Sequence, residues 1–265
     1  PTVVCPVLIG AVLHTDETLV SSATFIGKHV VEGMLTVPSG IVLTINNADL
    51  EFAGNGSIVV EQDAMLHVNL SVLKACNVTW KGIEVLGNSN KPQIPKHQGV
   101  VSINNSTVKD AVIGVFAGSW VNYLQNTDPS QSGGIVKVFN NSKMENNVID
   151  IYLSKYNQQS KQMKIMKSEF VQTNLSSSFS LIPKHILVEG TKGLIIQGNS
   201  FEGGGLGIVA NASQELQILK NIFTNVTVAI SGTGNKELVI FDNTFTDVEI
   251  GILLKEGETF KLHKN

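Results

Sequence analysis

Two lysines, Lys137 and Lys164, are the residues of this chain best suited to chemistry on an acidic sugar. They occupy similar positions in neighbouring copies of a repeat, so we expect both to point outward from adjacent strands. Lyases that act on uronates need cations to neutralise the substrate carboxylate and a base to remove the proton beside it. All 19 basic residues are Lys, so an enzyme of this kind would lack the usual Arg clamp and would depend on Lys and bound calcium.

The alternative for Lys137 and Lys164 is that they are solvated strand residues that discourage edge aggregation. A polysaccharide hydrolase would show paired aspartates on adjacent turns and a Gly-His-Gly motif, and the sequence contains no Asp-Asp and no Gly-His-Gly. Its one Asn-Thr-Asp, at residues 126–128, lies in a polar loop. The sequence therefore assigns no catalytic site beyond these two candidate lysines.

Three carboxylates, Asp242, Asp247 and Glu249, are close together in sequence and could bind calcium through oxygen ligands. One turn supplies few such ligands, so the alternative is that these three are ordinary polar residues of the surface. The six histidines, which have no metal-ligand spacing, are His14, His29, His67, His97, His185 and His263. We therefore assign no metal site and no cofactor, and keep calcium as the candidate ion.

An aromatic pair, Trp120 and Tyr123, lies in the insertion 117–134, where the repeat needs only a few residues. Long loops on a rigid scaffold are where binding residues concentrate, and flat aromatic rings can stack on sugars. Trp120 could instead fold back over the protein and fill the base of its own loop. Two further insertions, 87–98 and 154–162, are expected on the same side. The ligand-binding candidates are thus Trp120 and Tyr123.

Composition limits the classes of function. The net charge is −3 without a basic cluster, which gives no support to nucleic-acid binding, and no apolar run is long enough to span a membrane. The chain has two cysteines, Cys5 and Cys76. In a secreted protein they could form a disulfide, and otherwise they are small buried hydrophobic residues.

A repeat of 22 residues organises the chain around these candidates. Asn199, Asn221, Asn243 and Asn265 follow at this spacing, and so do Phe201, Phe223 and Phe245. Each copy has short runs of Val, Ile, Phe and Thr broken by Asn and Gly, which indicates strands and tight turns. A β-sandwich would not keep this constant spacing. The pattern predicts an all-β fold, a single-stranded right-handed parallel β-helix (solenoid) of about ten turns of roughly 22 residues or more.

The repeat also predicts contacts between turns. The recurrent Phe side chains should stack on one another inside the coil. The recurrent Asn suits a bend because it tolerates left-handed backbone angles and can hydrogen-bond to its copies in the turns above and below.

The expected organisation is an N-terminal cap segment at residues 1–28 and the β-helix at residues 29–265. Residues 258–265 match the first strand of a further turn, so we expect the sequence to be cut within that turn. An uncapped end would also allow end-to-end self-association, as in a fibre subunit.

The stretch Trp-Lys-Gly-Ile-Glu-Val at 80–85, with the stretches at 98–117 and 133–153, resembles a known group of proteins. These are the large secreted β-helix proteins, with a pectate-lyase-like fold, of gliding bacteria that use type IX secretion. The resemblance covers about residues 30–254 and implies a secreted or cell-surface location and architecture more firmly than any activity.

The function predicted from the sequence is a non-catalytic stalk, adhesin or glycan-binding module outside the cell. Its expected partner is a polysaccharide or cell-surface glycan. The alternatives are a polysaccharide lyase or hydrolase using lysine and calcium on the outer strand face, and a self-assembling fibre subunit.

Overall fold

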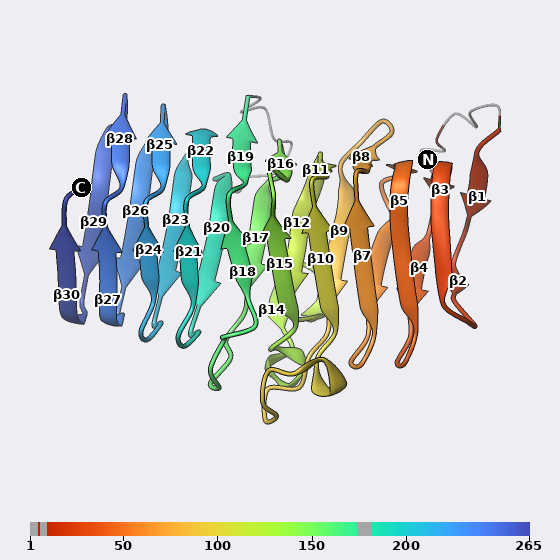
Figure 1. Cartoon of the computed structure of the whole chain (residues 1–265), viewed down its shortest axis with the longest axis horizontal. Helices are drawn as coiled ribbons and strands as arrows, with labels where there is room; N and C mark the ends of the chain where they lie inside the picture. Colours follow the sequence, from red (N-terminus) through yellow and green to blue (C-terminus); the bar gives the residue numbers. More distant parts are fainter. Residues whose placement is uncertain (1–4, 6–9, 174–181) are drawn as a thin grey trace.

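The chain winds into a parallel β-helix (Figure 1), in a computed structural model that describes residue 5 and residues 10–173 and 182–265. In the described residues two parallel sheets form its walls, one of 18 strands (the long sheet) and one of ten strands (the ten-stranded sheet). Each turn contributes one strand to the ten-stranded sheet, so the coil has ten turns before the last strand starts another. The prediction of an all-β solenoid of about ten turns is confirmed.

The ten-stranded sheet consists of β2 (Glu17–Thr18), β4 (Met34–Val37), β6 (Ser57–Val60), β9 (Trp80–Val85), β12 (Ala111–Ala117), β17 (Ile149–Leu153), β20 (Lys184–Glu189), β23 (Leu206–Asn211), β26 (Val228–Thr233) and β29 (Ile250–Lys255). The long sheet bends once in most turns and consists of β1 (Val12–His14), β3 (Ala23–Val31), β5 (Val42–Phe52), β7 (Met65–Asn69), β8 (Val72–Ala75), β10 (Val100–Asn104), β11 (Thr107–Lys109), β15 (Ile135–Phe139), β16 (Lys143–Glu145), β18 (Lys164–Met166), β19 (Glu169–Gln172), β21 (Ile195–Gln197), β22 (Ser200–Gly203), β24 (Gln217–Leu219), β25 (Ile222–Thr224), β27 (Lys236–Phe241), β28 (Thr244–Thr246) and β30 (Glu258–His263). A small antiparallel hairpin, β13 (Trp120–Asn122) and β14 (Asn126–Thr127), and two 3₁₀ turns, Pro95–His97 and Pro129–Gln131, project from this frame.

The core runs along the axis of the coil because inward side chains of successive turns lie in register. Phe170, Phe201, Phe223 and Phe245 form one stacked column, with ring centroids 4.8, 4.7 and 5.5 Å apart. Each turn alone would leave its apolar face open, and the stack closes it. The predicted Phe column is therefore present and extends one turn further back, to Phe170.

The recurrent Asn side chains form a ladder at the bend of the long sheet. The amide Nδ2 of Asn199 donates to Oδ1 of Asn221 at 3.1 Å, and Asn221 donates to Asn243 in the same way. The sequence suggested that these Asn residues themselves adopt left-handed backbone angles, and they do not. The left-handed angle falls one residue earlier, at Gly198, Lys220 and Asp242, because the Asn itself must turn its amide into the coil.

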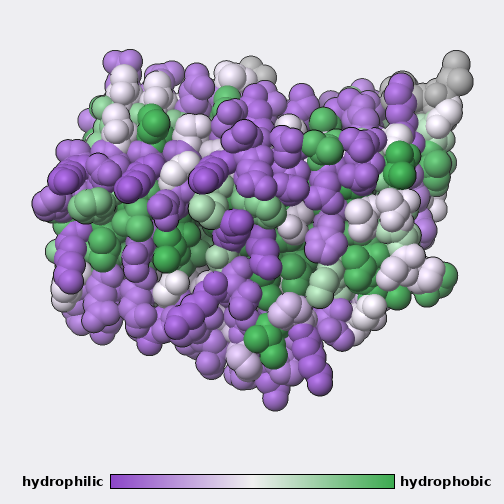
Figure 2. Space-filling view, in the orientation of Figure 1, coloured by the Kyte–Doolittle hydropathy of each residue, from purple (hydrophilic) through white to green (hydrophobic). Residues whose placement is uncertain are grey.

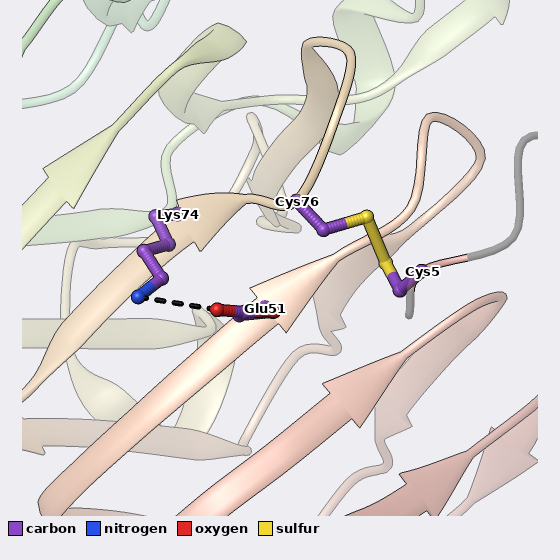
Figure 3. Close-up of a disulfide and its surroundings, with 4 residues drawn as sticks. All are labelled: Cys5, Glu51, Lys74 and Cys76. Carbon is purple, nitrogen blue, oxygen red and sulfur yellow. Dashed lines mark ion pairs between the residues drawn. A yellow bond between two sulfur atoms is a disulfide. The ribbon is translucent and has the colours of Figure 1, made fainter. Parts of the chain in front are cut away.

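The N-terminal part already belongs to the coil. Strand β1 pairs with β3, β2 pairs with β4, and the expected boundary after residue 28 falls inside β3. Residues 1–4 and 6–9 of that expected cap segment lie outside the described residues. Cys5 and Cys76 form a disulfide with their Cα atoms 5.7 Å apart, beside the ion pair of Lys74 with Glu51 (Figure 3).

The outer face of the long sheet is a mixed surface, in which hydrophilic residues surround apolar patches over the strands (Figure 2). Among the described residues there is no helix with the length and apolar character needed to cross a membrane.

Candidate functional site

An aromatic cluster lies on the outer face of the ten-stranded sheet. Phe116 on β12 and Tyr152 on β17 are register neighbours, and their rings stack with centroids 4.8 Å apart. Side chains alternate between the two faces of a strand, so these two point away from the core residues Val115 and Ile151. Both are nevertheless buried, since the loop that follows β12 covers them.

That loop places both aromatic binding candidates beside the cluster. Trp120 packs on Phe116, with centroids 4.8 Å apart, and lies 6.1 Å from Tyr152. Tyr123 meets the edge of Trp120 at 6.2 Å and is 39% exposed. Lys81 Nζ lies 5.7 Å from the centre of the Tyr123 ring. Trp120 therefore packs down over the base of its loop and is half-buried, and its part in ligand binding stays a prediction.

The three insertions meet on one side of the coil, as expected from the sequence, and project together from its lower edge in Figure 1. Gly87 N donates to Gln131 O at 2.7 Å, which joins the first insertion to the second. Tyr156 in the third insertion donates its hydroxyl to Lys91 O at 2.7 Å. Gln98 is fully buried and donates from Nε2 to the carbonyl oxygen of Asn88. These contacts give the loops a fixed arrangement.

An open pocket of about 630 Å³ lies beside the third insertion. Its lining includes Lys155 and Asn157 of that insertion and residues of the short bends of the next two turns. Glu189 at its edge accepts a hydrogen bond from the Tyr152 hydroxyl at 2.5 Å. The complete lining is Lys155, Tyr156, Asn157, Glu189, Gly190, Thr191, Lys192, Asn211, Ala212 and Gln214. Glu189 thus links the lining of the pocket to Tyr152 of the aromatic cluster.

Burial shifts the pKa values of several ionisable groups on this face. It raises the pKa of the Glu84 carboxyl, which the hydroxyl of Ser119 and the charge of Lys81 partly counteract. It also raises the pKa of Tyr123, with a further contribution from the charge of Glu84. The pKa of Tyr156 rises to about 12 for the same reason. Both phenols are thus protonated near neutral pH and can donate hydrogen bonds.

The two lysine candidates lie on the opposite wall of the coil. Lys137 on β15 and Lys164 on β18 are direct register neighbours on the long sheet. Lys164 Nζ lies 4.2 Å from the centre of the Phe139 ring, which partly compensates the repulsion between the two ammonium groups. The predicted adjacency is present, and it is separated from the aromatic loop.

The carboxylate candidates do not form a cluster. Asp242 follows β27, whereas Asp247 and Glu249 lie between β28 and β29, so the strand β28 separates them. Within the described ranges, no three His, Cys, Asp or Glu side chains come together in a way that could hold a metal ion.

Sequence reasoning missed the pocket. The sequence predicts the third insertion as a loop, and an aromatic residue such as Tyr156 within it indicates that the base of the loop is packed. The lining residues Glu189 and Lys192 carry no motif, and only the stacking of turns brings them beside Lys155.

Comparisons with solved structures find distant likenesses. The surface adhesin PfbA of Streptococcus pneumoniae is 11% identical with a TM-score of 0.41, covering 95% of this chain and 70% of that one. A second structure of PfbA gives 11% identity, a TM-score of 0.38 and coverage of 97% and 90%. The A-module of the mannuronan C-5 epimerase AlgE6 of Azotobacter vinelandii is 10% identical, with a TM-score of 0.31, and the alignment covers 91% of each chain.

No curated protein sequence matches this chain. One family model does match it, over residues 101–265, and its description reads "Periplasmic copper-binding protein (NosD)". The match spans more than half of the 265 residues. The chain belongs to the NosD family.

Proposed function

We propose that this protein is a non-catalytic β-helix that works outside the cytoplasm and binds a glycan at the outer face of its ten-stranded sheet. The observation that carries the proposal is the aromatic pair Trp120 and Tyr123, held half-exposed on a rigid scaffold by the Phe116–Tyr152 stack. Aromatic rings with a fixed orientation offer a flat surface for sugar rings, while the Tyr123 hydroxyl supplies a hydrogen bond.

Two observations support a location outside the cytoplasm. The Cys5–Cys76 disulfide is of a kind that persists in oxidising compartments and is rare in the cytosol. The family description names periplasmic proteins, which agrees with that chemistry. The secretion route suggested by the sequence resemblance stays a prediction.

The family description names copper, whose binding would depend on the donor groups of this chain. Copper favours imidazole and sulfur ligands, and both cysteines are consumed by the disulfide. His14 and His29 come closest to a site, but their facing nitrogens are hydrogen-bonded at 2.9 Å and His14 Nδ1 is bonded to Glu17. The described residues bring together no group of three His, Cys, Asp or Glu side chains, so they give no support to a copper site of that kind, and the proposed function involves no copper.

The experiment that tests the proposal is retention of the purified protein on immobilised polysaccharides. The variant Tyr123→Ala removes the exposed ring and should reduce retention at least about tenfold, as for loss of a stacking contact. Its thermal midpoint should stay near that of the wild type because Tyr123 is outside the core.

Val121→Ala is the matched control, since Val121 lies on the same hairpin, is 63% exposed, and should bind like the wild type. Equal retention of Tyr123→Ala and wild type would refute the proposal, and so would a wild type that no polysaccharide retains. The eluted glycans are also checked for shortening and for new ultraviolet absorbance in the presence of calcium. Cleavage that disappears in Lys137→Ala with Lys164→Ala would establish the lyase alternative instead.

A further inference from the structure

Two buried histidines face each other in the first described turn of the coil. His14 on β1 and His29 on β3 are 6% and 5% exposed, and His14 Nε2 lies 2.9 Å from His29 Nδ1. The ring of Phe25 stacks on both imidazoles, with its centroid 4.6 Å from each. The pair is therefore shielded from water, and its facing nitrogens are at hydrogen-bond distance.

The contacts of the pair fix where its protons lie. His29 Nε2 lies 3.2 Å from the carbonyl oxygen of Ile26, which can only accept, so this nitrogen carries a proton. One proton fits between His29 Nδ1 and His14 Nε2, because two N–H groups cannot point at each other across 2.9 Å. On its other side His14 Nδ1 lies 2.6 Å from Glu17 Oε2. The folded pair thus has room for one proton on its facing nitrogens, whereas two imidazolium rings would bring two.

The surroundings offer little to a second positive charge. Glu17 is half-exposed and contacts His14 but not His29. The strand β5 places buried apolar side chains opposite this part of β3, namely Ile45, Ala48 and Leu50. The other ionisable side chains on the neighbouring elements make no hydrogen bond or ion pair with either imidazole among the described residues; they are Asp16, Lys28, Glu32 and Asp49.

The charge balance at His29 agrees with this geometry. Burial lowers the pKa of His29 below its ordinary value of 6.5. The contact with Ile26 O opposes the shift, and the charge of His14 adds to it. A proton on His29 is therefore disfavoured while the turn stays folded.

His14 is also the side chain that attaches β1 to the coil. Val12 and Leu13 are 52% and 48% exposed, so His14 is the one buried residue of this strand. The chain before β1 is tied separately, because the Cys5–Cys76 disulfide joins it to the bend after β8. Loss of the contact between the two histidines would free β1 without releasing the segment from the protein.

We propose that the His14–His29 pair is a proton-operated latch on the first turn. Near neutral pH the shared proton holds β1 against β3. In acid a second proton enters the pair, the bond between the imidazoles breaks, and β1 leaves the edge of β3 while the disulfide keeps it attached. This inference is independent of the proposed glycan binding and gives the protein a local response to acid.

Proton linkage gives the direction of the effect. Because the folded pKa of His29 lies below 6.5, the unfolded turn binds more protons than the folded one just below this pH. The contribution of the pair to stability is full above about 6.5 and is lost as pH falls from there toward the lowered folded pKa.

Hydrogen exchange near pH 7 and near pH 5 tests the latch, with protection factors corrected for the intrinsic effect of pH on exchange. The best probe is the amide of Glu32, whose N donates to His14 O at 2.9 Å. Its protection should fall about tenfold in acid, the factor that corresponds to one pKa unit, and should return at neutral pH. Strand β26 should keep its protection and serves as the internal reference.

A variant without the second titration locates the effect. His29→Gln keeps an acceptor for His14 and a donor for Ile26 O but takes up no proton, so Glu32 should be equally protected at both pH values. His97→Gln is the matched control, the same substitution at a half-exposed histidine of the first insertion, and should respond to acid like the wild type.

An NMR titration of the wild-type imidazoles adds a measurement that needs no variant. His29 should titrate below 6.5, and the loss of protection at Glu32 should follow the same curve. The latch is overturned by a His29 that titrates at or above 6.5, by a Glu32 amide that stays protected in acid, or by a His29→Gln variant that loses protection as the wild type does.

Discussion

Polar side chains inside the coil are satisfied mainly by their counterparts in the next turn. Asn221 illustrates this: its Oδ1 accepts from the backbone N and from Nδ2 of Asn199, and its Nδ2 donates to Ile196 O. Earlier turns use serine at the same bend, with Ser106 Oγ accepting from the backbone N of Ser71. The ladder therefore fixes the register of the bend without leaving buried donors unpaired.

Removing one member should expose how much the ladder contributes. Asn221→Ala leaves the buried backbone N of Asn199 without its acceptor, so we expect a loss of about 2–3 kcal/mol in the free energy of unfolding. Denaturant titration measures it, and Asn90→Ala, at an exposed position, is the control with an expected change near zero. Similar stability of the two variants would contradict the role of the ladder.

Asp150 and His185 form a second buried polar group, in the wall between two turns. His185 Nδ1 lies 2.7 Å from Asp150 Oδ2, and Nε2 lies 3.0 Å from the carbonyl oxygen of Gly203, which can only accept. Asn147 Nδ2 donates to the other Asp150 oxygen. Burial raises the pKa of the Asp150 carboxyl, and the hydrogen bond from His185 counteracts it in part.

This shift predicts how stability depends on pH. The pKa of Asp150 is higher in the folded state than its ordinary value of 3.8, so its contribution to stability is fully present below that value and is lost as pH rises through the folded pKa. Asp150→Asn keeps the shape and the contact with Asn147 but removes the titration. The free energy of unfolding of wild type relative to this variant should fall as pH rises from about 4 toward neutrality, which a urea titration series would measure; a flat difference would contradict it. Glu202→Gln, at an exposed position, is the control.

At the scale of elements, short bends and long insertions have different tasks. The bends between β22 and β23, or between β25 and β26, are a few residues long and keep the turns in register. The insertion that contains β13 and β14 adds nothing to the ladder and instead covers Phe116 and Tyr152. Its role is to present side chains.

Replacing residues 119–132 with a two-residue Asn-Gly bend should therefore preserve the fold and remove the function. We expect an unchanged far-ultraviolet circular dichroism spectrum, loss of polysaccharide retention, and stronger binding of a hydrophobic dye because the Phe116–Tyr152 stack becomes exposed. Loss of β structure would show instead that the loop is required for folding.

At the scale of the molecule, each turn contacts only its neighbours, so stability is distributed along the coil. The disulfide is an exception, since it joins residues 71 positions apart and ties the N-terminal segment to the fourth turn. Constraining a loop of this length contributes up to about 4 kcal/mol in the chain-entropy model.

Reduction of the disulfide should lower the thermal midpoint and loosen the first turns before the last. A thermal scan with and without reductant measures the midpoint, and hydrogen exchange measures the loosening. We expect faster exchange in β3 and β5 and an unchanged exchange rate in β26. A Cys5→Ala, Cys76→Ala variant should be insensitive to reductant. If reduction accelerated hydrogen exchange equally in all strands, the coil would unfold as one unit.

The sequence by itself determined the architecture. A constant step of 22 residues means that equivalent side chains of successive turns touch, so the Phe column and the Asn ladder could be predicted from spacing alone. The same logic placed Lys137 beside Lys164.

Only the tertiary structure decided what lies off that period. The left-handed residue precedes each ladder Asn because the inward amide dictates the bend. The orientation of Trp120, the meeting of the three insertions, and the pocket between Lys155 and Lys192 depend on loops without a common spacing. Contacts between turns follow from the repeat, whereas contacts between insertions depend on the particular shape and packing of each loop.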